Sequence, residues 1–242
     1  PEGIPFILLK KCASALAPAV SFIINLSFAT ESIPSAWKTA IVVPIFKKGS
    51  SSDPSNYRPI ALTSSLSKVC ERLVRDYILD FLNSRSLLPP QQHGFLPRKS
   101  VTTQLVETID SISSDLDAGK PVDIIYFDFA KAFDTISHSI LIKKLLLLDF
   151  PSSLIKWIKD FLTNRTFKVS IDGTHSSSFS ATSGVPQGSV LGPILFLIYT
   201  LDLPSFCATN NVNIGMFADD VKAYSSDLSS QSLQLFVNKL SA

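Results

Sequence analysis

Three acidic residues stand at the ends of short apolar segments, and this pattern restricts the fold more than any other feature of the sequence. Asp128 follows residues 122–127, while Asp219 and Asp220 lie between residues 213–217 and 221–224. These segments have the length and the β-branched and aromatic content of strands. If the strands are neighbours in one sheet, the three carboxylates converge, and hard oxygen ligands of this kind select Mg²⁺ or Mn²⁺ over Zn²⁺.

Each acidic motif also has a simpler interpretation. Asp128 follows a run apolar enough to be a buried central strand, where a carboxylate is costly unless it is paired or binds a cation. It could instead cap the turn into the next segment. Asp219-Asp220 is an ordinary turn dipeptide, although two adjacent carboxylates repel each other and can recruit a cation. Taken one at a time, the motifs leave both interpretations open.

Motifs for other kinds of catalysis are missing from the sequence. The three histidines are isolated, no CxxC pair suggests zinc, and Gly-x-Ser-x-Gly is absent. Residues 184–193, GVPQGSVLGP, form a Gly- and Pro-rich segment whose backbone can approach a ligand closely. No Lys follows its last Gly, so it is not a Walker A loop, and a tight loop before the next helix is the simpler interpretation.

The periodicity of apolar residues predicts a chain of mixed helices and strands without internal repeats. One predicted helix, 67–82, is amphipathic, with Val69, Leu73, Tyr77 and Phe81 at helical spacing. The Gly-Lys-Pro break at 119–121 is the predicted subdomain boundary. Helices are predicted at 4–28, 67–82, 102–116, 137–149, 152–162 and 194–201. Strands are predicted at 40–43, 57–62, 122–127, 167–171, 177–181, 213–217 and 221–224.

Composition narrows the class of protein. With 242 residues, 45% of them apolar and only 17% charged, the chain predicts one large domain or two joined subdomains and excludes a disordered tail. The cysteines, at 12, 70 and 207, are too few and too scattered for a disulfide scaffold, which favours a reducing compartment. The chain opens with Pro1 and no signal segment, so we expect a fragment of an intracellular protein that is not secreted.

One nearly uncharged stretch, residues 12–28, raises the question of a membrane span. It is shorter than the roughly 20 apolar residues that a span needs, and it contains Pro18, Ser21, Asn25 and Ser27. We therefore predict a buried helix here and no membrane partner.

Positive charge is concentrated between residues 38 and 99. This region contains ten Lys and Arg residues against four acidic ones, although the whole chain is only +2. A phosphate-rich partner would explain the excess, and so would a solvated helix face. Charge alone leaves the two explanations open.

Taken together, the motifs resemble those of a known family. FDFAKAFD at 127–134, GVPQG at 184–188 and FADD at 217–220 resemble motifs A, B and C of reverse transcriptases, in the family's order and separations. Residues 49–60, with NYRPI at 56–60, resemble its fingers motifs. QHGF at 92–95, followed by Ser100, and KAFD at 131–134 with His138 resemble the non-LTR, LINE-type retrotransposon branch. The resemblance covers nearly the whole chain.

The resemblance implies an α+β fold, the right-hand polymerase palm, with an antiparallel sheet that carries the three acids and helices behind it. It implies an N-terminal helical extension at 1–28, fingers at 29–120 and a palm at 121–242, with the thumb absent. It also implies an RNA-directed DNA polymerase that transfers nucleotides by a two-metal mechanism. The implied partners are an RNA template, a DNA primer and deoxynucleoside triphosphates, and the implied location is nuclear or cytoplasmic.

The resemblance also assigns roles to single residues. Asp128, Asp219 and Asp220 match the acids that hold two Mg²⁺ ions, with Mn²⁺ possible. Phe133 matches the ring that blocks a 2′-hydroxyl. Further matches line the nucleotide pocket or meet the triphosphate or template backbone: Gln187, Gly188, Arg58 and either Lys47 or Lys48.

Several alternatives stay open. The chain ends at Ala242, soon after Asp220, without the family's primer grip, thumb or nuclease, so we expect the isolated fragment to polymerise poorly. It could be a catalytically incompetent fragment or a host-recruited RNA-binding domain, although the acids, Phe133 and Gln187 are all present. An intron maturase-type reverse transcriptase is a further alternative. The sequence does not predict the oligomeric state.

Overall fold

The computed structural model describes residues 6–226, 234 and 236–239. The chain divides into two compact units that are both discontinuous in sequence. The first unit consists of Pro1–Leu79 and Phe133–Ile198, and the second of Asp80–Ala132 and Tyr199–Ala242. This division by contacts is not a division into fingers and palm, so the predicted ranges 1–28, 29–120 and 121–242 stay predictions.

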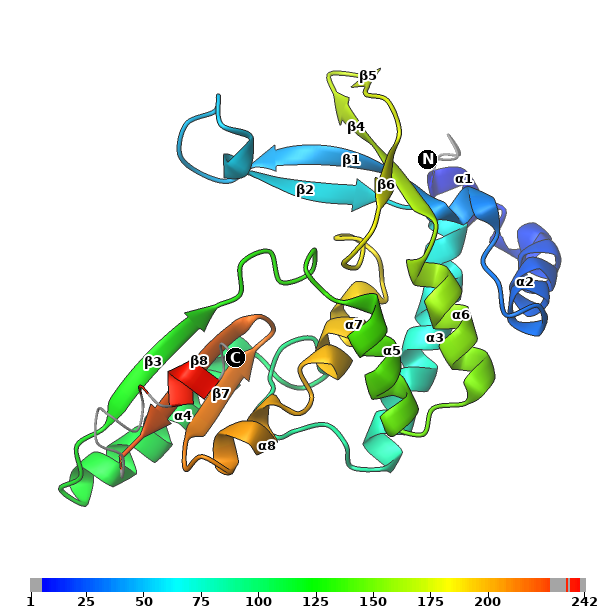
Figure 1. The fold of residues 1–242 in the computed structure, drawn as a ribbon. Helices are drawn as coiled ribbons and strands as arrows, with labels where there is room; N and C mark the ends of the chain where they lie inside the picture. Colours follow the sequence, from blue (N-terminus) through cyan, green and yellow to red (C-terminus); the bar gives the residue numbers. More distant parts are fainter. Residues whose placement is uncertain (1–5, 227–233, 235, 240–242) are drawn as a thin grey trace. The chain divides into compact units, whose positions relative to one another are not determined.

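The first unit contains a mixed five-stranded sheet (Figure 1). Strands β1 (Thr39–Phe46) and β2 (Tyr57–Leu62) form an antiparallel hairpin, and β1 also pairs in parallel with β4 (Arg165–Ile171). Two short strands, β5 (Thr174–His175) and β6 (Phe179–Ala181), both pair antiparallel with β4. The tip of the β1–β2 hairpin contains the 3₁₀ turn η2 (Pro54–Asn56), whose first turn is capped by the Asp53 carboxylate accepting from Ser55 N at 2.9 Å.

Helices α5 (His138–Leu147) and α6 (Ser152–Leu162) provide much of the first unit's core. Their fully buried side chains include Leu141, Leu145, Trp157, Ile158 and Phe161. The other helical elements in this unit are α1 (Phe6–Lys11), α2 (Ala13–Ala29), η1 (Ser35–Lys38) and α7 (Gly192–Tyr199), whose last residue belongs to the second unit. Helix α3 (Ser65–Ser84) begins in the first unit and ends in the second.

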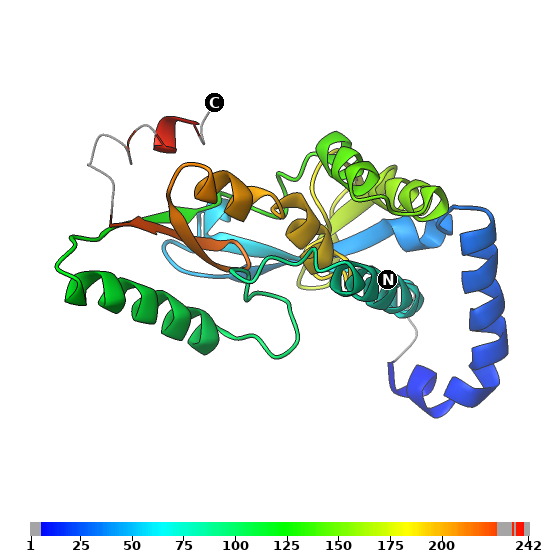
Figure 2. The same cartoon turned by 90° about the horizontal axis from the view of Figure 1, so that it is seen from below.

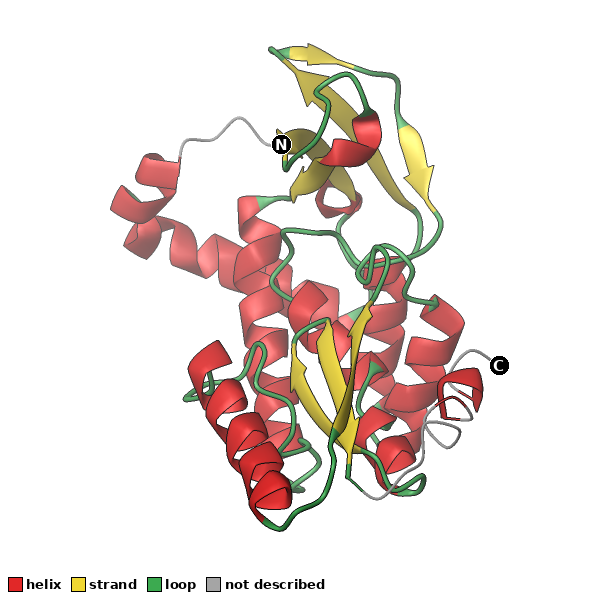
Figure 3. Ribbon diagram, turned by 90° about the vertical axis from the view of Figure 1, so that its left-hand side faces the viewer, coloured by secondary structure: helices red, strands yellow, loops and turns green. Residues whose placement is uncertain are grey.

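The second unit contains a three-stranded antiparallel sheet in the order β3-β8-β7, formed by Asp123–Asp128, Asp220–Ser225 and Asn213–Phe217 (Figure 3). Helix α4 (Val101–Asp117) lies on one side of this sheet and α8 (Leu203–Ala208) on the other (Figure 2). On the α8 side, alternate residues of the strands form an apolar core with α8 and Phe236. The members of this core include Cys207, Ile214, Met216, Val221, Ala223 and Phe236.

Side chains from α4 fit against a glycine on the opposite face of the sheet. A Cβ atom at Gly215 would lie 2.5 Å from Gln104 Nε2 and 2.7 Å from Thr108 Oγ1, so only glycine lets α4 approach β7 this closely. Gln104 Nε2 donates to Thr108 Oγ1 at 2.8 Å, and Lys222 Nζ of β8 donates to Gln104 Oε1 at 3.1 Å. These bonds satisfy polar groups on an otherwise tightly packed face.

Most predicted elements are present, but three expectations about burial are wrong. Strand β3 is an edge strand rather than a central one, since the sheet order is β3-β8-β7. It is also only partly buried: alternate residues such as Phe127 face the core, while Tyr126 is 70% exposed. Helix α3 buries Cys70, Val74, Ile78 and Leu82 and leaves Val69, Leu73 and Tyr77 exposed. The helix has two apolar stripes, and the periodicity identified the exposed one.

The third wrong expectation concerns residues 12–28. Helix α2 forms there, but Ile24 and Ser27 are its only buried residues, so a nearly uncharged composition did not mean burial. Residues 4 and 5 of the predicted helix lie outside the described residues. None of the described helices combines the length and the hydropathy that crossing a membrane requires.

Candidate active site

The β7–β8 hairpin of the second unit carries two of the three candidate acids. Phe217 pairs with Asp220, so Ala218 and Asp219 form a two-residue turn between the strands. Ala218 has φ +56°, in the left-handed region that such turns require and that Gly, Asn or Asp usually occupies. Asp219 is half-buried and Asp220 is exposed.

Asp128, at the end of β3, lies directly opposite Asp220 in the antiparallel pairing of β3 and β8. Side chains that are directly opposite in such a pair project from the same face, with Cα atoms roughly 4.5–5.5 Å apart. The structure therefore brings Asp128 and Asp220 together across neighbouring strands, and Asp219 precedes Asp220 in the adjoining turn. The strands that the sequence predicted as neighbours are neighbours.

The electrostatics of this strand end would favour a cation. Like charges directly opposite each other destabilise a sheet unless something neutralises them. Lys222, on the same strand as Asp220, is engaged by Gln104. Asp128 and Asp220 are exposed and stay hydrated, so the desolvation expected for Asp128 does not apply.

Adjacent strands do not by themselves bring all three carboxylates close enough to bind one metal ion. Across the described ranges, no three His, Cys, Asp or Glu side chains are grouped closely enough to hold a metal ion. The donor type, carboxylate oxygen on two adjacent strand ends, is the one that Mg²⁺ and Mn²⁺ prefer. The residues present thus fit a hard divalent cation by donor type, and strand register brings two of the three, Asp128 and Asp220, together.

The predicted nucleotide-pocket residues belong to the first unit. Gln187 lies in the loop after β6, where its Nε2 donates to both carboxylate oxygens of Asp134, at 3.0 and 3.1 Å. The Gln187 carbonyl accepts from Ala61 N of β2 at 2.7 Å. The ring of Phe133 packs on Phe196 with centroids 5.2 Å apart, so it is part of the packing around α7.

Two glycines let this loop lie against other backbone segments. Gly184 has φ +76°, and a Cβ there would lie 2.6 Å from Asp134 Cα. Gly188 has φ +117°, and a Cβ there would lie 2.5 Å from the Ala61 carbonyl. The sequence predicted close approach to a ligand, and the described contacts are with the protein's own backbone.

A pocket of 370 Å³ lies inside the first unit, between this loop and the mixed sheet. Apolar groups from β1 and β2 line it, together with Asp134, Arg165 and Gln187. Arg165 is buried, and its guanidinium donates to the carbonyls of Phe161 and Trp37 at 3.0 and 3.2 Å. Burial lowers the pKa of Arg165, and nearby Glu71 opposes that shift.

The three predicted phosphate-binding cations lie at the tip of the β1–β2 hairpin, and all are exposed. Arg58 pairs with Ile45, and Lys47 N donates to the Asn56 carbonyl at 2.8 Å just beyond the last strand pair. Lys48 follows at the tip. This end of the hairpin therefore presents three exposed positive charges to the solvent.

The sequence interpretation missed Glu71, a buried carboxylate on α3. Its Oε2 accepts from Val190 N at 2.7 Å and Leu191 N at 3.2 Å, and its Oε1 accepts from Ser67 Oγ at 2.9 Å. Glu71 is 1% exposed and holds the backbone just before α7. The sequence did contain a signal for this role: Glu71 is an acidic residue beside the apolar stripe of Cys70, Val74 and Ile78.

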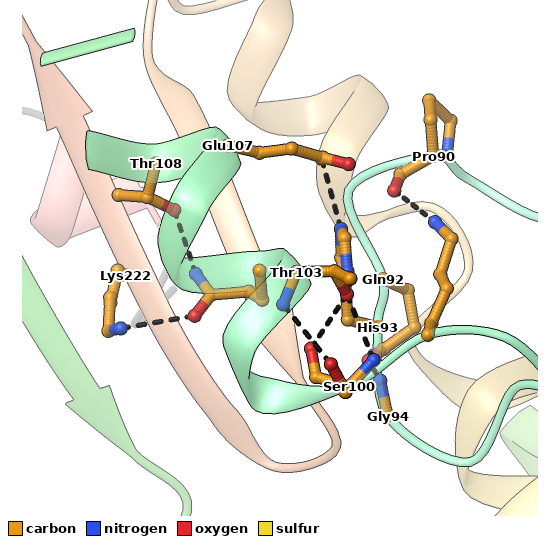
Figure 4. A network of polar contacts seen from close by, with 11 residues as sticks. Pro90, Gln92, His93, Gly94, Ser100, Thr103, Glu107, Thr108 and Lys222 are labelled. Carbon is orange, nitrogen blue, oxygen red and sulfur yellow. Dashed lines mark hydrogen bonds and ion pairs between the residues drawn. The ribbon is translucent and has the colours of Figure 1, made fainter. Parts of the chain in front are cut away.

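The sequence interpretation also gave no role to residues 91–94, which form a polar network with α4 and β7 (Figure 4). His93 is 2% exposed; its Nδ1 lies 2.8 Å from Thr103 Oγ1 and its Nε2 lies 3.0 Å from Glu107 Oε2. Thr103 and Ser100 form a capping box at the start of α4. Two polar residues and a glycine before a capped helix were the signal in the sequence.

Comparison with known proteins identifies the class of protein to which this fold and site belong. Residues 45–242 match the family described as reverse transcriptase (RNA-dependent DNA polymerase). The chain belongs to the reverse transcriptase family.

Similar proteins come from mobile elements of the non-LTR kind. The chain is 33% identical over 233 residues to the probable RNA-directed DNA polymerase from transposon BS of Drosophila melanogaster, covering 92% of this chain and 26% of that protein. It is 35% identical over 193 residues to the RNA-directed DNA polymerase from mobile element jockey of the same species, covering 77% and 21%. The chain thus spans about a quarter or less of these relatives' length.

Solved structures share the fold at low identity. Apo telomerase from Candida tropicalis, truncated from its C-terminal domain, has a TM-score of 0.64 at 15% identity, covering 93% of this chain and 50% of that chain. Telomerase from Candida albicans in complex with the TWJ fragment of telomeric RNA has a TM-score of 0.61 at 15% identity, covering 99% and 45%. The chain therefore has a polymerase fold, α+β with a mixed sheet and packed helices.

Proposed function

We propose that this chain is the polymerase core of a non-LTR retrotransposon protein and catalyses RNA-directed DNA synthesis. One observation carries the proposal: strand register sets Asp128 opposite Asp220, with Asp219 in the adjoining turn. The named relatives are RNA-directed DNA polymerases of mobile elements, which supports the same activity.

In this proposal Asp128, Asp219 and Asp220 would hold two Mg²⁺ ions, or Mn²⁺ in their place. When bound, such ions activate a hydroxyl nucleophile and neutralise the charge that develops on a triphosphate. The protein's own contribution is to fix the carboxylates on two paired strand ends before substrate arrives, which avoids reorganisation during the reaction.

We assign the nucleotide contacts to the first unit. Asp134 engages the Nε2 group of Gln187, which leaves Gln187 Oε1 as an acceptor toward the incoming nucleotide. Gly188 lies beside Gln187 and would flank the incoming nucleotide, and the Phe133 ring would exclude a 2′-hydroxyl by its volume. Arg58 can contact phosphate through two parallel hydrogen bonds, and Lys47 or Lys48 acts as a point charge.

The proposed partners follow from this chemistry: an RNA template, a DNA primer and deoxynucleoside triphosphates. The local excess of positive charge between residues 38 and 99 supports a polyanionic partner. We also propose that the protein acts inside the cell, in the nucleus or cytoplasm, where these substrates are found.

Primer extension on an RNA template tests the proposal, using the product of the open reading frame that encodes this chain. Asp128→Asn and Asp219→Asn should each lower kcat by roughly 10²-fold or more, because each removes a charge from the proposed metal site. Asp123→Asn, at the other end of β3 opposite Ser225, is the matched control and should retain wild-type extension. Equal extension by wild type and Asp219→Asn would remove the mechanism.

A second function, RNA binding without catalysis, is favoured by one observation. In the described part of the chain, the three acids do not form a group that could hold a metal ion. If wild type and Asp219→Asn both bind an RNA–DNA primer–template tightly and neither extends it at any Mg²⁺ or Mn²⁺ concentration, this second function replaces the first.

A further inference from the structure

The turn that carries Asp219 holds an unfavourable backbone conformation. Ala218 has φ +56°, which costs a non-glycine residue roughly 1 kcal/mol or more and persists only where surrounding groups enforce it. The Ala218 side chain is 6% exposed. Something in the surrounding structure must therefore hold this residue, and Asp219 immediately follows it.

The side-chain amide of Gln92 holds both polar groups of the Ala218 backbone. Gln92 Oε1 accepts from Ala218 N at 3.0 Å, and Gln92 Nε2 donates to the Ala218 carbonyl at 3.4 Å. The same Oε1 accepts from Gly94 N at 2.7 Å, which fixes the amide's orientation. Gln92 is 2% exposed, so water does not compete for these bonds.

The loop that carries Gln92 is itself fixed to β7. His93 N donates to the Met216 carbonyl at 2.9 Å, and Met216 N donates to the Gln91 carbonyl at 3.0 Å, so Gln92 and Met216 form a parallel bridge. A Cβ atom at Gly94 would lie 2.1 Å from Ala218 N, so the loop backbone rests directly against the turn. All of these groups belong to the second unit.

The far side of the loop is fixed to α4 by the buried His93 ring, which lies between Thr103 and Glu107 (Figure 4). The Lys99 ammonium donates to the Pro90 carbonyl and closes the loop at its base. Helix α4 in turn contacts β7 and β8 through Gln104. Contacts from β7 to the loop, from the loop to α4, and from α4 back to β7 and β8 therefore support the Ala218–Asp219 turn.

We propose that Gln92 is a positioning residue for Asp219: it fixes the left-handed Ala218 backbone and thereby the direction in which the Asp219 carboxylate projects. Gln92 touches neither substrate nor metal in this assignment. The assignment deepens the proposed function and rests on it for the role of Asp219.

The test compares Gln92→Met with Gln91→Met in the product of the open reading frame that encodes the chain. Methionine keeps the length of the side chain but cannot hold the Ala218 backbone, whereas Gln91→Met leaves the Gln91 backbone bond to Met216 intact. We expect Gln92→Met to lower kcat for primer extension roughly 10- to 100-fold and to raise the Mg²⁺ concentration at half-maximal rate, with KM for the nucleotide within about 3-fold. Gln91→Met should match wild type.

A double variant separates positioning from a general loss of folded protein. Gln92→Met combined with Ala218→Gly should regain several-fold in kcat, because glycine adopts positive φ without strain. A loss of folded enzyme would lower the rate without moving the Mg²⁺ midpoint. Wild-type kcat and midpoint in Gln92→Met, or no recovery in the double variant, would overturn the assignment.

Two further measurements keep the test decisive. If Gln92→Met does not fold, Gln92→Glu replaces it. The second carboxylate oxygen then faces the Ala218 carbonyl, so kcat should fall at least about 5-fold, and wild-type values would overturn the assignment.

If wild type has no polymerase activity, the proposed function fails separately. Amide hydrogen exchange then decides: Ala218 and Gly94 should exchange at least about 10-fold faster in Gln92→Met than in Gln91→Met, and equal rates would refute positioning.

Discussion

At the scale of single residues, the hydrogen bonds of Gln187 specify what that side chain can offer a nucleotide. Both Asp134 oxygens accept from Gln187 Nε2, and the Gln187 carbonyl is occupied by Ala61 N. Of the side-chain amide, the oxygen is the end left to recognise a partner, so Asp134 determines which end of the amide points outward.

Changing Asp134 should therefore affect nucleotide use more than fold. Asp134→Ala frees the Gln187 amide to rotate, and we expect kcat/KM for the nucleotide to fall roughly 10-fold. Asp134→Asn can still offer one oxygen to Gln187 and should lose less than about 3-fold. Steady-state extension kinetics measure both; equal values for Asp134→Ala and wild type would contradict the role given to Asp134.

The three cysteines should differ in reactivity. Cys70 and Cys207 are 0% and 1% exposed, and burial raises their pKa values to about 12 and about 11, with the neighbouring Glu71 adding to the shift of Cys70. Because only thiolate reacts, both should be inert to a thiol reagent at pH 8, while the half-buried Cys12 reacts first.

Timed labelling with and without denaturant measures this difference, with one fast thiol expected in the native protein and three in the unfolded one. The same shifts have a consequence for stability. A folded-state thiol with a raised pKa stays protonated while the unfolded one ionises, so the free energy of unfolding should fall as pH rises from about 9 through 12. Fast labelling of a second native thiol would contradict the burial described here.

At the scale of elements, local sequence signals predicted the strands around the candidate site well. The hairpin that carries Asp219 and the strand that ends at Asp128 follow from short apolar runs bounded by polar turns. Their antiparallel pairing, with the acids at the strand ends, agrees with the fold class predicted from the resemblance.

Burial was harder to predict than element type, because it depends on what packs against each face. Helix α3 has apolar residues on two sides, and only the packing decides that Val74 and Ile78 are buried while Leu73 and Tyr77 are exposed. The role of Gln92 could not be predicted for a related reason: its partner, Ala218, is 126 residues away in the chain. Neither propensity nor periodicity carries information over such a separation.

Glu71 on α3 provides a stability test of one element against another. Glu71→Gln leaves two backbone N–H groups before α7 with a weaker acceptor, and Glu71→Leu leaves them with none. We expect Glu71→Leu to lower the free energy of unfolding by about 3 kcal/mol and Glu71→Gln by less. Asp76→Asn, on the exposed side of the same helix, is the control and should cost under about 1 kcal/mol.

Denaturant titration of the three variants measures these values. A Glu71→Leu variant as stable as Asp76→Asn would show that the bonds from Val190 and Leu191 are not needed to hold the backbone before α7.

At the scale of the whole chain, the two units could not be predicted from the order of motifs. Each is assembled from two segments, and α3 runs through the boundary between them. The parallel pairing of β1 with β4 joins residues 127 positions apart, from Thr39–Thr166 onward, without any local signal. The fingers and palm ranges predicted from the resemblance follow motif order, so they stay predictions beside a division that follows contacts.

Charge is distributed unevenly over the whole chain, and this predicts how it should bind nucleic acid. The region 38–99 is strongly basic while the whole chain is only +2, so the rest is net acidic. Nucleic acid should therefore bind through electrostatic contacts with residues 38–99 and not through the charge of the whole chain. Each phosphate contact contributes roughly 0.9 to the slope of log K against log salt concentration on a duplex, and about 0.7 on a single strand.

Removing the exposed cations at the hairpin tip should reduce that slope. The triple variant Lys47→Ala, Lys48→Ala and Arg58→Ala should lower the slope magnitude by roughly 2 and weaken binding to an RNA–DNA primer–template most at low salt. A second triple variant, Lys11→Ala, Lys143→Ala and Lys159→Ala, removes the same charge from exposed positions outside the basic region and should leave the slope within about 0.5 of wild type. Equal slopes in the two triple variants would mean that net charge, and not the hairpin tip, attracts the nucleic acid.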